Sequence, residues 1–291
     1  MNERTFRIQT LIRQLTILAV FACVAALPAL AQQPKTEPTP APPQRAEAPA
    51  QPSQPAPAIE EKAEKILQRA VAALGGDAYL RVRSSTGRGL FTPFREGVSS
   101  IPSSFVDYII YPDKERTEFR GGGSKTIQTN TGETGWIYDG AAKTIKDMTP
   151  LQVTDFKQAM RTNVDNLLRG QWRKEGAKVT YLGRREAGLA RRNEAVRVVY
   201  PGDFIVDFEF SAQDGLPAKI LYTRANAEGE EVSEEDRLAQ FVNTNGVSSP
   251  FVIDHYTTGI QTSRINYQAI EFNTTIPDTL FARPASVKAI K

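Results

Sequence analysis

From residue 79 to residue 273 the sequence is a succession of short extended runs separated by turn residues. Pro112-Asp113, Gly121-Gly122-Gly123 and Asp139-Gly140 mark three of these turns. Short turns join strands that pair antiparallel, because a parallel crossover needs about a dozen residues or more. The sequence therefore predicts an antiparallel meander, with strands at residues 79–91, 104–111, 114–120, 125–130, 135–139, 178–183, 194–200, 204–210, 216–224, 237–243, 251–258 and 261–273.

Two amphipathic helices are predicted beside these strands. The first ends at Gly75-Gly76 and has apolar residues at helical spacing: Ala63, Ile66, Leu67, Ala70, Val71 and Leu74. The second, over 149–170, has Pro150 at its first position and a capping box of Thr149 and Gln152. Its apolar face steps by three and four residues: Val153, Phe156, Met160, Val164 and Leu167.

Residues 1–31 have the features of a bacterial signal peptide. Three arginines precede an apolar run over 15–22, and the small residues that end at Ala31 form a cleavage site before Gln32. The apolar run is shorter than the roughly 20 residues that a membrane span needs. We therefore expect export to the periplasm, with cleavage after Ala31.

The single cysteine leaves a second processing route open. Cys23 follows Val20-Phe21-Ala22 and so resembles the site at which bacterial lipoproteins are cleaved and acylated, which would anchor the chain to a membrane. The bulky Phe21 and the apolar residues after Cys23 disfavour this route. Cleavage after Ala31 would leave no cysteine, and this would exclude disulfides, thiol nucleophiles and cysteine metal sites.

Residues 32–58 form a segment rich in Pro, Ala and Gln, with no aromatic and no branched aliphatic side chain. Such a segment cannot bury enough apolar surface to offset its ordering entropy, so a disordered linker is expected. Residues 59–291 would then form one β-rich domain, and a single domain can have this length.

The charge of the chain gives no sign of a nucleic-acid partner. The chain has 36 Lys and Arg against 33 Asp and Glu, and removal of residues 1–31 leaves 33 against 32. Binding to a polyanion would require these basic residues to gather on one face. Arg184-Arg185 and Arg191-Arg192 flank a turn, but the interleaved Glu186 and Glu194 favour an exposed hairpin over a basic patch.

Residue types that usually carry chemistry are scarce. The only histidine in the sequence, His255, lies in an apolar and aromatic run, where a structural role is expected. One histidine cannot form a zinc site that needs several histidine ligands. The acidic residues between 228 and 236 lack the pattern of a calcium loop, so a solvated loop is favoured. We expect no metal, no cofactor and no catalytic residue, although Asp, Glu or Ser chemistry stays open.

Large apolar side chains are the remaining candidates for function. For each of them a place in the core is the simplest reading. A curved sheet beside amphipathic helices can instead leave a concave apolar interior. The residues expected to line it are Phe105, Ile109, Trp136, Tyr138, Phe156, Met160 and Leu167. In this arrangement the second helix faces the sheet that carries Trp136 and Tyr138.

Several segments occur in a distinctive order: a helix that ends in Leu74-Gly75-Gly76, the tryptophan-bearing segment 135–140, an inserted helix, and a closing run over 270–281. The closing run has an Asn-x-x-Ile-x-x-x-x-Phe ending. In this order the chain resembles the LolA-like outer-membrane lipoprotein-sorting proteins. The resemblance implies an α+β fold, a half-open and strongly curved antiparallel β-barrel closed by amphipathic helices. It also implies an apolar cavity for the acyl chains of a lipid or lipoprotein.

Two features depart from a simple carrier: the long linker, and extra sequence around residues 228–249. The same fold also serves regulators that sense envelope lipids. The resemblance therefore implies a periplasmic lipid or lipoprotein carrier or, alternatively, a lipid-sensing regulator or adaptor that acts through an envelope protein. An enzyme is the least favoured class, because histidine and cysteine are so few.

We expect the exported chain to begin at Gln32, because the cleavage site precedes that residue. Intact-mass measurement and N-terminal sequencing of protein from the periplasmic fraction would test this. Recovery of a diacylated chain that begins at Cys23, in the membrane fraction, would contradict it.

Overall fold

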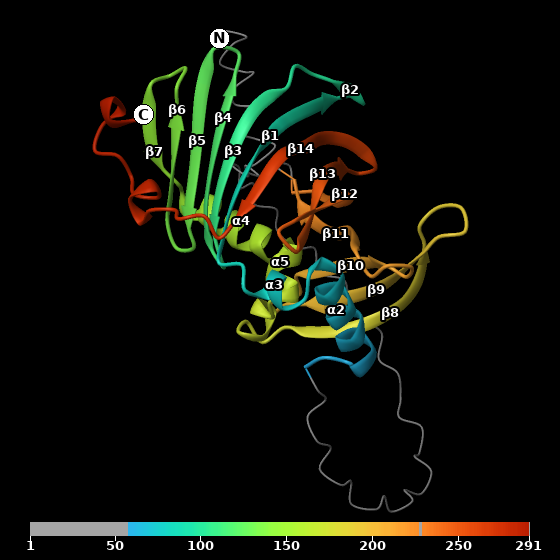
Figure 1. The fold of residues 1–291 in the computed structure, drawn as a ribbon. Helices are drawn as coiled ribbons and strands as arrows, with labels where there is room; N and C mark the ends of the chain where they lie inside the picture. The colour runs from blue at the N-terminus through green and yellow to red at the C-terminus, as the bar shows by residue number, and fades with distance from the viewer. Residues whose placement is uncertain (1–57, 227–228, 291) are drawn as a thin grey trace, which may run out of the picture. The chain divides into compact units, whose positions relative to one another are not determined.

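The computed structural model describes residues 58–226 and 229–290, which form an α+β domain with one large antiparallel sheet (Figure 1). The predicted signal peptide with Cys23, and the predicted linker apart from residue 58, lie outside these residues. No helix among the described residues is both long and apolar enough to cross a membrane. The strands are β1 (Ser84–Arg95), β2 (Val98–Ser99), β3 (Ser103–Ile110), β4 (Lys114–Gly121), β5 (Ser124–Thr131), β6 (Gly135–Asp139), β7 (Thr144–Asp147), β8 (Lys178–Glu186), β9 (Arg192–Val199), β10 (Ile205–Ser211), β11 (Pro217–Ala225), β12 (Glu231–Thr244), β13 (Val247–Thr257) and β14 (Ile260–Phe272). The helices are α2 (Glu61–Leu74), α3 (Asp77–Leu80), α4 (Pro150–Thr162) and α5 (Val164–Leu168), with short 3-10 helices η1 (Gln171–Arg173), η2 (Asp278–Leu280) and η3 (Val287–Ala289).

Thirteen strands form one continuous sheet in the order β7-β6-β5-β4-β3-β1-β14-β13-β12-β11-β10-β9-β8, and β2 pairs with β1. Neighbouring strands are antiparallel, as the short turns predict. The last strand, β14, returns to pair between β1 and β13. The two edge strands, β7 and β8, follow each other in the chain, and the segment that joins them contains α4, α5 and η1.

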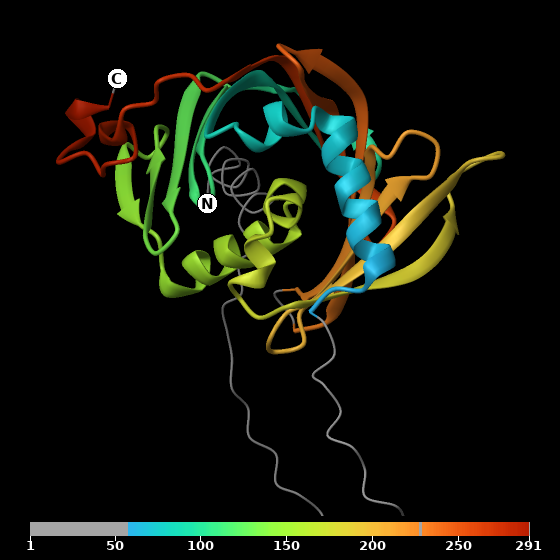
Figure 2. The same cartoon turned by 60° about the horizontal axis from the view of Figure 1, so that its bottom comes forward.

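The sheet is strongly curved, and the helices lie on its concave side (Figure 2). Four strand pairs contain register shifts of the kind that β-bulges produce, and bulges bend strands. One shift lies at Gly89 of β1, where a Cβ atom would overlap the carbonyl oxygen of Asn266 in β14. Glycine is required there because it alone has no Cβ atom.

The first predicted helix is confirmed as α2. Its buried residues, Ala63, Leu67, Ala70 and Leu74, recur every three or four positions. Gly75 ends the helix with a φ of 122°, and its N–H donates a hydrogen bond to the carbonyl of Ala72. This cap matches the predicted glycine stop.

The second predicted helix is present but broken into α4 and α5. Thr149 and Gln152 form the predicted capping box, with Pro150 at the start of α4. Asn163 has an extended backbone (φ −79°, ψ 125°), and its Oδ1 accepts a hydrogen bond from the N–H of Asp165. The expectation of one continuous helix is wrong, because the Asn163 side chain caps a new helix in place of continuing the first.

Three further expectations are corrected. The strand predicted over 79–91 begins only at Ser84, because Tyr79 and Leu80 belong to α3, where the N–H of Leu80 donates to the carbonyl of Gly76 in a helical turn. The sequence predicts no strand at β7, which pairs with β6. The acidic stretch predicted as a solvated loop forms the start of β12 from Glu231 onward. It is ordered there because Glu234 accepts a hydrogen bond from the hydroxyl of Thr257 in β13.

The main core lies between the helices and the strands at the β8 end of the sheet. It joins α2, α5 and η1 to β8, β9, β10 and β11, and its larger buried residues are Leu67, Leu74, Leu167, Trp172, Val179, Val196, Val198, Val206, Phe208, Phe210 and Ile220. A smaller core packs Phe91, Phe105 and Phe119 from β1, β3 and β4. These two clusters are separate from each other.

The segment after β14 crosses strands β4 to β6, as the red ribbon in Figure 1 shows. The Nε1 of Trp136 donates a hydrogen bond to the carbonyl of Phe281 at 2.9 Å, and Trp136 is 3 % exposed. The guanidinium of Arg116 donates to the carbonyl of Leu280 at 2.7 Å. The tryptophan-bearing strand and the closing Phe281 therefore lie together in the fold.

A cluster of four residues fixes α5 to the rest of the domain, and we call it the Asp165 cluster: Tyr79, Tyr111, Asp165 and Arg169. The hydroxyls of Tyr79 and Tyr111 donate to the two carboxylate oxygens of Asp165 at 2.5 Å and 3.0 Å. The Arg169 guanidinium lies over both tyrosine rings and donates to the carbonyl of Val82. Burial and the charge of Asp165 raise the pKa of both tyrosines, so their hydroxyls remain donors.

Replacing Asp165 by alanine should lower the free energy of unfolding by about 2–3 kcal/mol, because two buried hydroxyls lose an ionised acceptor. Urea denaturation measures the change, with Asp203→Asn in an exposed turn as the control. Tyr79→Phe and Tyr111→Phe should then cost little in the Asp165→Ala background. Fully additive losses would contradict the cluster.

Candidate functional site

Two adjoining cavities lie on the concave side of the sheet. The apolar cavity has a volume of about 270 Å³, and the polar cavity one of about 340 Å³. Ala159, Thr162 and Asp236 line both cavities, so they meet at α4 and β12. Their combined size lies in the range of small-molecule pockets, roughly 300–1,000 Å³.

The apolar cavity lies between the helices and strands of both halves of the sheet. Aliphatic and aromatic side chains form most of its wall: Leu74, Val82, Ile109, Ile220, Leu238, Phe241, Val247, Ile270 and Phe272. The Asp165 cluster also lines it. Because the cluster hydrogen-bonds internally, the same residues can hold α5 in place and bound this cavity.

The polar cavity lies under α4, over β4, β5 and β11 to β14. Its aromatic residues are Phe91, Phe119, Phe156 and Tyr222. Its charged and amide side chains are Glu115, Gln128, Asn130, Gln152, Asp155, Arg224, Glu234, Asp236 and His255. The interior therefore has two chemically different compartments side by side.

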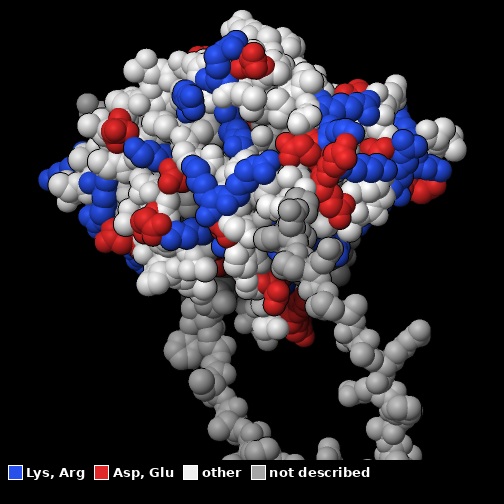
Figure 3. Space-filling model, turned by 90° about the horizontal axis from the view of Figure 1, so that it is seen from below, with Lys and Arg blue, Asp and Glu red and all other residues white. Residues whose placement is uncertain are grey.

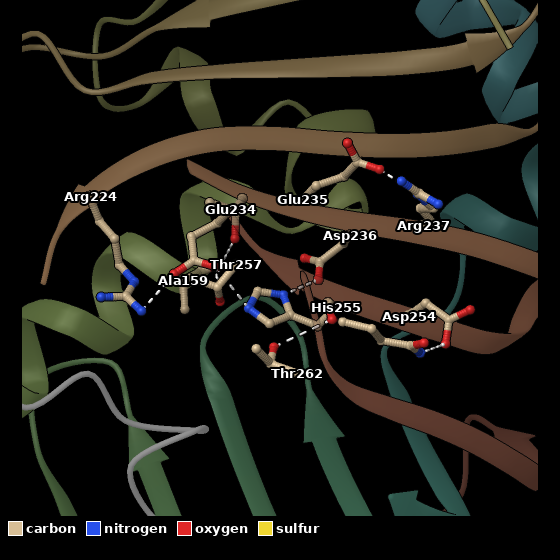
Figure 4. A network of polar contacts seen from close by, with 12 residues as sticks. Ala159, Arg224, Glu234, Glu235, Asp236, Arg237, Asp254, His255, Thr257 and Thr262 are labelled. Atoms are coloured by element: carbon tan, nitrogen blue, oxygen red, sulfur yellow. Dashed lines mark hydrogen bonds and ion pairs between the residues drawn. The ribbon is translucent and has the colours of Figure 1, made fainter. Parts of the chain in front are cut away.

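Glu234 of β12 is the centre of a charged network in the polar cavity (Figure 4). Its carboxylate lies 3.1 Å from the Nε2 of His255 and 2.6 Å from the Nη2 of Arg224. It also accepts a hydrogen bond from the hydroxyl of Thr257 at 2.7 Å. The Nδ1 of His255 lies 2.6 Å from Asp236. The network depends on strand register, since Glu234 faces Thr257 and Asp236 faces His255 across β12 and β13.

His255 is held in its protonated form. Burial lowers the pKa of His255, but the hydrogen bonds that its ring donates to Asp236 and Glu234 outweigh this effect and raise that pKa to about 10. A histidine that is protonated near neutral pH, with a carboxylate on each ring nitrogen, cannot act there as a general base. The geometry gives His255 a charge-balancing role.

A second pair of carboxyls lies where the cavities approach each other. The hydroxyl of Thr117 is 2.7 Å from Asp107, which lines the apolar cavity, and 3.4 Å from Glu115, which lines the polar one. Burial raises the pKa of both carboxyls, and Asp107 raises that of Glu115 further. The pair therefore retains a proton near neutral pH.

The seven side chains expected to line an apolar interior lie in different parts of the structure. Ile109 lines the apolar cavity and Phe156 the polar cavity. Phe105 packs in the smaller core, and Leu167 packs in the main core. The sulfur of Met160 lies 3.5 Å from the amide nitrogen of Asn166.

Trp136 and Tyr138 lie on the other face of the sheet. Residues directly opposite in an antiparallel pair share a face. Thr129 is opposite Trp136, whereas Asn130, the next residue of β5, points into the polar cavity. The helix α4 lies over the face of this sheet that carries Asn130, so the side chains of Trp136 and Tyr138 point away from it.

Most of the residues that line the cavities are not apparent from the sequence alone. Leu238, Ile270 and Phe272 line the apolar cavity, and Ile270 and Phe272 alternate along β14 as residues on one face do. Glu234 and Asp236 show the same alternation in β12. Alternating acids in a strand could have indicated an inward-facing charged row.

Charges on the surface are mixed in sign. Basic and acidic side chains lie next to each other over the face seen from below in Figure 3. In the β8–β9 hairpin, for example, Arg184 pairs with Glu194 and Arg192 with Glu186. Among the described residues, no group of three or more His, Cys, Asp and Glu side chains is arranged to hold a metal ion.

Known proteins match this chain in three-dimensional structure but not in sequence-based comparisons. No protein-family model and no curated protein matches the sequence. A DUF1329 family protein from Desulfovibrio piger matches with a TM-score of 0.53 at 12 % identity, over 76 % of this chain and 97 % of that one. A protein described as an outer membrane lipoprotein-sorting protein domain from Vibrio parahaemolyticus matches with a TM-score of 0.51 at 11 % identity, over 75 % and 97 %. A LolA superfamily protein from Nitrosomonas europaea matches with a TM-score of 0.51 at 11 % identity, over 76 % and 97 %. The curved sheet with its helices is thus a LolA-like fold.

Proposed function

We propose that this protein is a carrier that holds the acyl chains of a lipid or lipoprotein in its apolar cavity and moves them through the bacterial periplasm. The observation that carries the proposal is the apolar cavity itself, which lies between the sheet and the helices and is lined by side chains such as Ile109, Leu238 and Phe272. Each acyl CH₂ group exposed to water costs about 0.8 kcal/mol. A carrier therefore needs an apolar container and no catalytic group.

In this proposal α4 and α5 close the half-open barrel. Two observations support it: the segment that contains them joins the two edge strands, and Ala159, Thr162 and Val164 line the apolar cavity. The fold shared with the lipoprotein-sorting domain is consistent with a carrier, although a fold can serve many functions. The proposed signal peptide would deliver the chain to the periplasm.

A second candidate is a lipid-sensing regulator or adaptor that acts through an envelope protein. The observation that favours it is exposed apolar surface at one end of the sheet, where Val98 is 69 % and Ile101 is 86 % exposed. Exposed apolar side chains can mark a protein contact. Purification from envelope extract separates the two: bound lipid with transfer activity supports the carrier, and a stable protein complex supports the regulator.

Lysine at Ile109 should weaken binding of a fluorescent fatty acid, such as dansyl-undecanoic acid, because its ammonium would require hydration inside the apolar cavity. We expect Ile109→Lys to unfold cooperatively at a lower temperature and to bind the probe at least about tenfold more weakly. A tenfold loss of affinity corresponds to the free-energy cost of leaving one buried polar group unpaired. Fluorescence titration with thermal denaturation measures both effects.

Ile109→Trp tests the same cavity without a charge, since an indole fills space that the acyl chain needs. Val98→Lys, at an exposed position of β2, is the control and should bind normally. If both Ile109 variants stay folded and bind the probe as the unmodified protein does, the apolar cavity is not the binding site.

A further inference from the structure

A register shift in β14 places Tyr267 in the wall of the apolar cavity. Side chains three positions apart in a regular strand point to opposite faces, yet Tyr267 and Ile270 both line this cavity. The pairing of β14 with β1 explains this, because Gln268 is left without an opposite residue between two consecutive residues of β1. Such an extra residue re-aims the side chains beside it, and shifts of this kind are common next to binding sites.

Two glycines of β1 make room for this tyrosine. A Cβ atom on Gly87 would lie 2.6 Å from Cε1 of the Tyr267 ring, and one on Gly89 would lie 2.8 Å from the Cα of Tyr267. Neither glycine has a positive φ, so the position requires the missing side chain and not an unusual backbone. Glycine inside a strand often marks such a close approach. The place of the ring is therefore built into two neighbouring strands.

The hydroxyl of Tyr267 is an unused donor. Three tyrosines line the apolar cavity, and two of them, Tyr79 and Tyr111, donate to Asp165. The Tyr267 hydroxyl forms no hydrogen bond within the described part of the chain, and it is not sealed off by protein atoms. Burial, followed by the nearby Asp107, raises the pKa of Tyr267, so its hydroxyl keeps the proton that it can donate.

The charged groups in the wall of this cavity leave no cation for an anionic ligand. Among the described residues that line it, Arg169 is the only Lys, Arg or His, and its guanidinium lies over two tyrosine rings and donates to backbone carbonyls. Three carboxyl groups, from Asp107, Asp165 and Asp236, line the same cavity. A ligand carboxylate would be buried there without a partner of opposite charge, whereas an uncharged carbonyl would not incur that cost.

We propose that the Tyr267 hydroxyl binds the carbonyl oxygen of an ester-linked acyl chain, and that the apolar cavity thereby selects uncharged acyl esters over free fatty acids. The hydroxyl would donate one hydrogen bond to the carbonyl, and aliphatic and aromatic side chains such as Ile270 and Phe272 would contact the hydrocarbon. This inference rests on the proposed carrier function and adds the class of ligand and the residue that positions it.

Three ligands of similar chain length test the proposal: methyl decanoate, which is an ester, decanoate, which is an anion, and dodecane, which has no polar group. Displacement of the fluorescent fatty acid from the full exported chain gives their affinities, once the affinity of the probe for each variant is known. Near neutral pH we expect the ester to bind more tightly than decanoate. Tyr267→Phe should weaken binding of the ester about threefold to tenfold, as the loss of one hydrogen bond predicts, and should leave the affinity for dodecane unchanged.

Tyr138→Phe removes a hydroxyl on the other face of the sheet and is the control, with no change expected for either ligand. Tyr267→Phe retains the ring that packs over Gly87 and should stay folded, which thermal denaturation checks. An unchanged affinity for the ester, or an equal loss for ester and dodecane, would overturn the role of Tyr267 and leave the proposed carrier intact. Tighter binding of decanoate than of the ester would overturn the selection of uncharged ligands. Failure of the unmodified protein to bind the probe or any of the three ligands would overturn the carrier function and, with it, this inference.

Discussion

The Asp165 cluster is the interaction on which the arrangement of helices and sheet depends. One carboxylate receives the hydroxyls of Tyr79 from α3 and Tyr111 from the end of β3, and Arg169 spans both rings. A break at Asn163 places Asp165 at the start of α5. The Asp165 carboxylate accepts from both tyrosines, and Arg169 donates to the backbone carbonyls of Tyr79 and Val82, so these polar groups have partners where they line the apolar cavity.

The two cavities follow from which side chains the sheet presents to its concave side. In one half, aliphatic residues pack against α2 and α5 and leave the apolar cavity at the edge of this core. Around the other cavity, Glu234, Asp236 and His255 balance their charges across β12 and β13. The proposed lipid would place its acyl chain in the apolar cavity.

Features encoded by local sequence could be predicted. The capping box at Thr149, the glycine stop at Gly75 and most strands depend on residues close in the chain, and the structure confirms them. Asn163 was harder to anticipate, because an asparagine within an apolar helical pattern can either continue the helix or cap a new one.

The site itself depends on long-range pairing, which the sequence alone does not specify. Trp136 and Asn130 lie on opposite faces because of the β5–β6 register, and a shift of one residue would reverse both. Glu234 appears in the sequence as one more acid in a polar run, but the pairing of β12 with β13 places it against His255 and Thr257. Of the seven side chains expected to line an apolar interior, only Ile109 and Phe156 are among the residues that line the two cavities. The sequence alone does not distinguish the acidic residues of β12 from other exposed acids.

A fold that serves as a container for a lipid should retain one through gentle purification. Native mass spectrometry of the full exported chain, purified without detergent from its own periplasm, detects such a lipid. We expect a population heavier than the polypeptide by the mass of one lipid, which organic extraction releases and which tandem spectra identify by its acyl chain. A spectrum that contains only the bare polypeptide, from protein that afterwards takes up no fatty-acid probe, would contradict it.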